Sequence, residues 1–237
     1  MTTFLRAHWQ ITILAFAVFA LWSTPVLYPL RILIVFFHEL SHGLAALVTG
    51  GSIVSLTLTP DEGGLAVTNG GNRFVILSAG YLGSLLVGVA LFLVALRTRL
   101  DHVAVAGLGL CTLLLAALYI RDGFPLVFCL LTGTALLLIA WFTGHGANDL
   151  ALRLVGLASM LYVPNDIISD TIARAHLRSD ARMLAEEFGG ATMLWGGAWL
   201  LTSLVVIALT LRFALGTKSN IDLRVNSSPA VRGVPRR

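Results

Sequence analysis

The sequence predicts an all-α multi-pass membrane protein with about six to seven transmembrane helices and a small β-hairpin after the helix that carries the motif HELSH. Of its 237 residues, 57% are apolar and only 12% are charged, and the mean hydropathy is +0.88. Soluble domains have about 45–50% apolar and about 25% charged residues, so half of the usual charge is missing. This composition excludes a disordered chain, an ordinary cytosolic enzyme and a nucleic-acid-binding protein.

Apolar runs of the right length for membrane spans recur along the chain. A hydrocarbon core about 30 Å thick is crossed by about 20 apolar helical residues. Seven segments approach this length, the sixth being the weakest: 9–30, 32–49, 74–96, 103–120, 124–142, 150–172 and 192–213. We therefore expect one integral membrane domain over 1–215, embedded in a lipid bilayer. The polar, Arg-rich remainder, 216–237, has no hydrophobic period and predicts a disordered tail.

The stretch 50–72 interrupts this pattern because it is too polar to cross a bilayer. Two short runs of β-type residues, 53–59 and 65–68, flank the turn sequence Pro60-Asp61-Glu62-Gly63-Gly64. Pro, Asp and Gly between such runs are typical of a hairpin. The sequence thus predicts a β-hairpin over about 52–69.

The second apolar segment carries the residues with chemistry. His38 and His42 are four apart, so on a helix they lie on one face, one turn apart. Two imidazoles placed in this way can both bind one Zn²⁺ ion. Glu39 projects beside them, where it can accept a proton from an attacking water. This is the H-E-x-x-H pattern of zinc hydrolases.

The alternative for this motif is a polar contact between helices, in which the three side chains form hydrogen bonds only. Buried ionisable groups cost several kcal/mol in lipid unless they face a partner or a water-filled cavity. A bound metal ion gives these buried groups a partner more readily than a contact between helices does. We therefore expect a zinc site.

Zinc in a catalytic site takes a third protein ligand and keeps one position for water. The sixth apolar segment offers Asp166 and Asp170, again four apart and on one helical face. One of the two is expected to be the third ligand, and the other to orient a ligand. Spacing alone does not choose between them.

The order of these features resembles the site-2-protease-type intramembrane zinc metallopeptidases, in their short bacterial B-like branch. The HELSH helix is followed by a Gly-rich hairpin, by SAGYLGS at 78–84 and by the later aspartates. A further motif of that branch is similar to SDA at 179–181 with Trp195 and Trp199. The resemblance covers about residues 30–215. Taken by themselves, Ser179 or Asp180 are more simply interpreted as a helix N-cap.

The resemblance implies a zinc endopeptidase of the plasma membrane that cleaves membrane-embedded protein substrates. It makes His38 and His42 zinc ligands, Glu39 the catalytic acid/base, and Asp166 or Asp170 the third ligand. The chain departs from better-studied members in having Asn165-Asp166 where they have Leu-Asp-Gly, and in lacking a PDZ-like insert.

A substrate helix must be unwound before its carbonyls are accessible. The hairpin, at Leu56 and Leu58, is expected to offer an edge strand for the unwound segment. Two other functions remain open from the sequence: a zinc-binding sensor or scaffold without turnover, and a transporter. A transporter is disfavoured because the sequence shows no repeat. The sequence does not indicate the oligomeric state.

Overall fold

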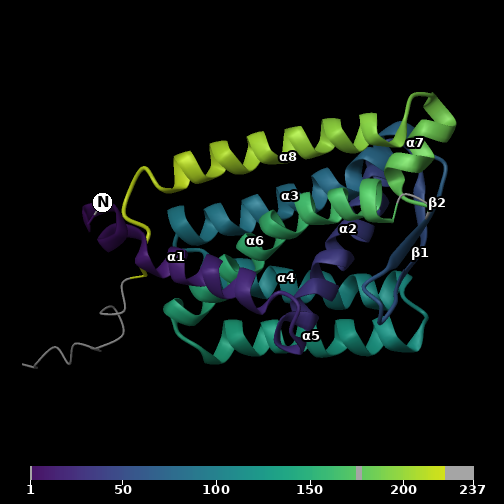
Figure 1. Cartoon of the computed structure of the whole chain (residues 1–237). Coiled ribbons are helices and arrows are strands. Elements are labelled where there is room, and N and C mark those ends of the chain that lie inside the picture. The colour runs from purple at the N-terminus through teal and green to yellow at the C-terminus, as the bar shows by residue number, and fades with distance from the viewer. Residues whose placement is uncertain (1, 175–177, 222–237) are drawn as a thin grey trace, which may run out of the picture.

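A computed structural model describes residues 2–174 and 178–221. Within these ranges the chain forms long helices packed roughly along one direction, with a two-stranded hairpin at one end (Figure 1). The elements, in chain order, are α1 (Thr2–Leu21), a 3₁₀ turn (Pro25–Leu27), α2 (Tyr28–Val48), β1 (Ser52–Leu58), β2 (Gly64–Asn69), α3 (Arg73–Arg97), α4 (Asp101–Tyr119), α5 (Gly123–Phe142), α6 (His145–Ile168), a π-helical turn η2 (Ser169–Ala173), α7 (Asp180–Phe188) and α8 (Thr192–Ala214).

Seven of the described helices are long and apolar enough to cross a membrane. This confirms the predicted fold class, a multi-pass helical membrane protein with one small antiparallel sheet. The boundary between the first two spans was misplaced, because α1 ends at Leu21 and α2 starts only at Tyr28. Pro25 and Pro29 explain the break. Proline fits the first turn of a helix, so each marks a start, and the chain between the two spans turns instead of continuing 9–30 as one helix.

Helix α2 lies at the centre of the bundle. Of its most apolar window, 78% is buried inside the protein, whereas the corresponding share for α1, α4, α5 and α8 is between 17% and 28%. α3 and α6 contact it directly. The outer helices therefore present most of their apolar surface to lipid, and polar groups on α2 are shielded from it.

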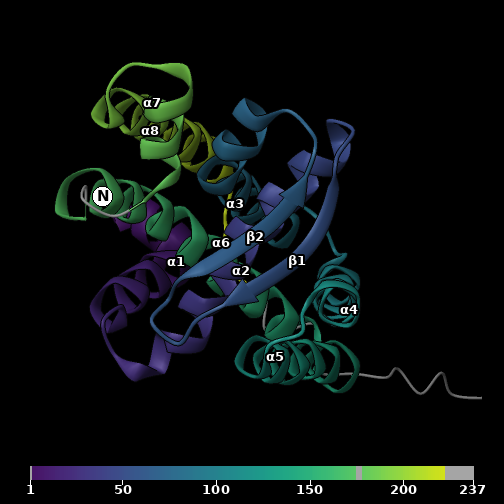
Figure 2. The ribbon, with the colours of Figure 1, turned by 90° about the vertical axis from the view of Figure 1, so that its right-hand side faces the viewer.

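The hairpin lies across one end of the bundle, over α2, with α7 at the same end (Figures 1 and 2). β1 and β2 pair antiparallel, Leu56 opposite Ala66 and Leu58 opposite Gly64. The side chains of Leu56 and Leu58 are buried in the hydrophobic core with residues of α2. This apolar anchoring fixes the hairpin on the helix that carries HELSH.

At the opposite end of the bundle, the first residues after α8 lie against α1. The Ser219 amide donates to the Ala7 carbonyl at 3.1 Å, and the Ser219 hydroxyl is 2.7 Å from the His8 ring. Residues 222–237, which make up most of the predicted tail, lie outside the described residues.

Candidate metal centre

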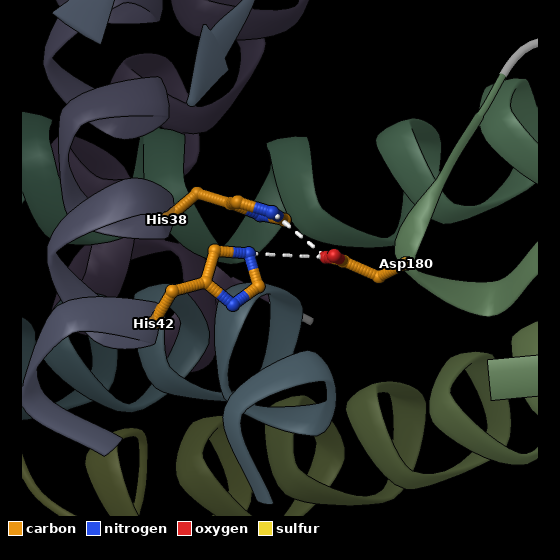
Figure 3. A group of neighbouring side chains, drawn as sticks. All are labelled: His38, His42 and Asp180. Atoms are coloured by element: carbon orange, nitrogen blue, oxygen red, sulfur yellow. Dashed lines mark hydrogen bonds and ion pairs between the residues drawn. The ribbon is translucent and has the colours of Figure 1, made fainter. Parts of the chain in front are cut away.

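Two histidines of α2 and one aspartate of α7 converge at the hairpin end of the bundle. Asp180 Oδ2 lies 3.0 Å from His38 Nε2 and 3.2 Å from His42 Nε2 (Figure 3). Among the described His, Cys, Asp and Glu residues, these three form the group of donor atoms close enough to hold one ion. The arrangement joins residues 142 positions apart in the chain.

The histidine rings are held in place by α3, which passes very close to α2. A Cβ on Gly80 would lie within 2.6 Å of ring atoms of both His38 and His42, so only glycine leaves room for the rings there. His42 Nδ1 lies 2.6 Å from the carbonyl oxygen of Ile76 and donates to it. In the neutral ring this bond places the proton on Nδ1, so that Nε2, which is directed at the centre, can bind a metal, as in metal-binding histidines generally.

Asp180 comes from the first turn of α7, outside the apolar spans. The Ser179 side chain caps this helix by accepting from the amide of Arg182 at 3.3 Å, as expected for an N-cap. Burial raises the pKa of the Asp180 carboxyl, but His42 and His38 together lower it more, and the net pKa lies below its ordinary value. Asp180 is therefore an ionised carboxylate directed at two imidazoles.

This donor set fits zinc. Zinc takes imidazole nitrogen and carboxylate oxygen at about 2.0–2.2 Å in tetrahedral geometry, which places donor atoms about 3.3–3.5 Å apart. The separations of 3.0 and 3.2 Å from Asp180 to the two rings are close to that spacing. Two neutral imidazoles and one carboxylate are also a donor set typical of catalytic zinc, which keeps one position open.

Glu39 is buried beside the three donors and lines the same cavity, which has a volume of about 420 Å³. Strand β2 forms the wall opposite its carboxylate. The Ala66 backbone hydrogen-bonds to that carboxylate, and a Cβ on Gly64 would lie 2.5 Å from Glu39 Cγ. The acid/base candidate thus lies between the metal donors and the hairpin.

Asp166 and Asp170 line the cavity but are not in the three-donor group. Both carboxylates face Arg174, whose Nη2 lies 2.6 Å from Asp170 Oδ1 and 3.3 Å from Asp166 Oδ1. Asp170 also accepts a hydrogen bond from the Tyr81 hydroxyl. The geometry therefore gives these two aspartates an arginine as partner, and it brings Asp180 to the histidines.

The structure also changes which strand is next to the cavity. Leu56 and Leu58 of β1 are directed into the core, whereas Gly64, Leu65 and Ala66 of β2 line the cavity. An edge strand offered to a substrate would be β2. Asp180 was not among the donors expected from the sequence, although the SDA motif at 179–181 was a signal for it, and within the predicted hairpin the sequence singled out Leu56 and Leu58 rather than residues of β2.

Most of the chain matches a known protein family. Residues 11–210 match the model of the Peptidase M50B-like family. The chain belongs to that family. The match spans most of the chain and includes the HELSH helix, both hairpin strands and α7, and it confirms the resemblance to the site-2-protease-type family. Membership, together with the seven apolar helices, supports an integral membrane metallopeptidase. Neither curated proteins nor solved structures give a match.

Proposed function

We propose that this protein is a zinc-dependent intramembrane endopeptidase that hydrolyses peptide bonds of membrane-embedded proteins. The observation that carries the proposal is the convergence of His38, His42 and Asp180 beside Glu39, in one cavity next to the buried helix α2. The bacterial plasma membrane is the proposed location, on the basis of the resemblance alone.

In this proposal His38, His42 and Asp180 hold the ion, and Asp180 replaces Asp166 or Asp170 as the third ligand. A zinc ion held there would supply Lewis acidity that activates a water and polarises the scissile carbonyl. Glu39 accepts the proton of the attacking water at its carboxylate and delivers it to the leaving amine. His42 is kept in the correct tautomer by the Ile76 carbonyl throughout.

The substrate segment must reach the cavity in extended form. Strand β2 has one edge paired with β1, and three of its residues line the cavity. An unwound substrate segment can add to the free edge by β-augmentation, which satisfies its backbone groups next to Glu39. This places the scissile bond between β2 and the three donors.

A zinc-binding sensor or scaffold without turnover is the second candidate function. It accounts for the three donors but gives Glu39 no role, although Glu39 is buried against the cavity at a cost in desolvation. The proposed endopeptidase uses all four side chains. A transporter finds no specific support, because residues of β2 and α7, which lie at one end of the bundle (Figure 1), line the cavity.

The experiment compares wild-type protein with Glu39→Gln for zinc content and for cleavage of co-expressed membrane substrates. Equal zinc in both, with cleavage lost in the variant, supports the endopeptidase. Equal zinc and no cleavage by either protein supports the sensor or scaffold. A wild type without zinc would overturn the metal assignment.

A further inference from the structure

The turn of the hairpin is fastened to α2 by a buried arginine. Arg31 Nη2 lies 2.8 Å from Glu62 Oε1, and Arg31 Nε donates to the same oxygen at 2.9 Å. The Arg31 side chain is only 11% exposed. Its guanidinium also donates to the carbonyls of Trp22 and Thr24, between α1 and α2. One side chain therefore joins the start of α2, the connection before it and the hairpin turn.

The turn is held in a conformation that its residue type does not favour. Glu62 has a φ of 63°, in the left-handed region, where residues with a side chain are uncommon. Such a conformation persists where surrounding contacts hold it. The ion pair to Arg31 is such a contact, and a second is the Tyr28 hydroxyl, which donates to the Pro60 carbonyl at 2.9 Å.

Two residues after Glu62, the chain packs directly on Glu39. Gly64 approaches so closely that an added Cβ would lie 2.6 Å from Glu39 Oε1. The next contact along β2 is the hydrogen bond from the Ala66 backbone to the Glu39 carboxylate. The position of β2 therefore determines the position of the Glu39 carboxylate. The Arg31–Glu62 ion pair in turn holds the residues just before β2.

We propose that the Arg31–Glu62 ion pair is a positioning device for Glu39, acting through the close contact of Gly64 with the Glu39 side chain. Arg31 and Glu39 lie on the same helix, about two turns apart. Helix α2 thus carries both the catalytic carboxylate and the residue that fixes the strand against it. Neither Arg31 nor Glu62 is a zinc donor. The inference rests on the proposed peptidase function.

The test is Glu62→Gln, which keeps the shape of the side chain and removes its charge. We expect unchanged zinc content, with kcat lowered about 10- to 100-fold, because a catalytic group misplaced by about 1 Å can cost about 100-fold. The matched control is Glu186→Gln, which breaks a pair with Arg182 on an exposed part of α7 and should leave kcat unchanged. A raised KM with wild-type kcat would overturn the proposal, since the hairpin would then act in substrate binding only.

A second variant, Glu62→Gly, separates the ion pair from the strain of the turn. Glycine accepts the left-handed conformation freely, so the turn is retained while the ion pair is lost. We expect kcat to fall here as well; a Glu62→Gly protein with wild-type kcat would overturn the proposal, because turn geometry alone would then suffice.

Hydrogen exchange tests whether the Arg31–Glu62 ion pair holds β2 in place, and it needs no measurement of cleavage. The amides of residues 64–66 should exchange faster in Glu62→Gln than in wild type, while those of α2 stay protected. Equal exchange at 64–66 would contradict the positioning role. A wild type that binds zinc but does not cleave would refute the proposed peptidase, and the exchange experiment would still decide whether the ion pair holds β2.

Discussion

Replacing Gly80 by alanine tests whether α3 holds the two histidines in place for the metal. The added Cβ would lie 2.6 Å from the Cε1 atoms of both His38 and His42. Carbon atoms in contact are about 3.5–4.0 Å apart, so each ring, or α3 itself, must move by about 1 Å. Metal–ligand distances tolerate about 0.2 Å. We therefore expect zinc affinity to fall by at least about 10- to 100-fold, the range found when groups that orient metal ligands are lost.

The assay is zinc competition with a chelator, combined with thermal unfolding in the presence of excess chelator. The matched control is Gly107→Ala in α4, where an added Cβ meets nothing within 4 Å. Alanine favours the helix at both positions by about 0.5–1 kcal/mol, so a fall in affinity at Gly80 alone isolates the clash. A Gly80→Ala protein that binds zinc as tightly as wild type would refute the reasoning.

Three further predictions concern the third ligand, its helix and the buried charges. Asp180→Asn should reduce zinc content strongly while Asp170→Asn keeps it near wild type; the reverse result, by metal analysis, would restore Asp170 as ligand. Ser179→Ala removes the N-cap of α7, so the free energy of unfolding should fall by about 1 kcal/mol and zinc binding should weaken. Both effects are measured by denaturation with and without metal. Unchanged values would contradict the capping role of Ser179. Arg153→Met leaves the Asp149 carboxylate, now 2.5 Å from Arg153 Nε, buried and unpaired. This should cost about 3–5 kcal/mol in stability at unchanged zinc affinity, and a smaller cost would show that water reaches the carboxylate.

The spans and the hairpin were predictable from the sequence because both depend on local patterns. A membrane span is determined by a run of apolar residues, and Pro60-Asp61-Glu62-Gly63-Gly64 marks a turn between two β-type runs. The motif HELSH likewise fixes His38 and His42 on one face through helical spacing alone. The boundary that lay furthest from its expected position, the end of the first span, falls in an apolar stretch where the prolines, and not the hydropathy, mark the break between α1 and α2.

The proposed third donor, Asp180, could not be derived in the same way. Asp166 and Asp170 have the spacing of a pair on one helical face, but spacing does not tell which partner that face meets. The structure gives them Arg174, close to both in the sequence. The SDA motif at 179–181 points to Asp180 only through the family resemblance, since a Ser-Asp pair before a helix is by itself typical of an N-cap. Its role depends on how α7 docks, which is a tertiary property.

The proposed division of donors between the long apolar helix α2 and the short polar helix α7 follows from the energetics of buried charge. An ionisable side chain within an apolar span is expensive unless it has a partner or lines a cavity, as His38, Glu39 and His42 do. The two aspartates within α6 and η2 are accordingly paired with Arg174. Asp180 instead enters the cavity from outside the spans, fixed by Ala181 and Leu184, both fully buried. In the proposed site the donor set is complete only with α7 docked, so metal binding and the docking of α7 are expected to stabilise each other by the same free energy.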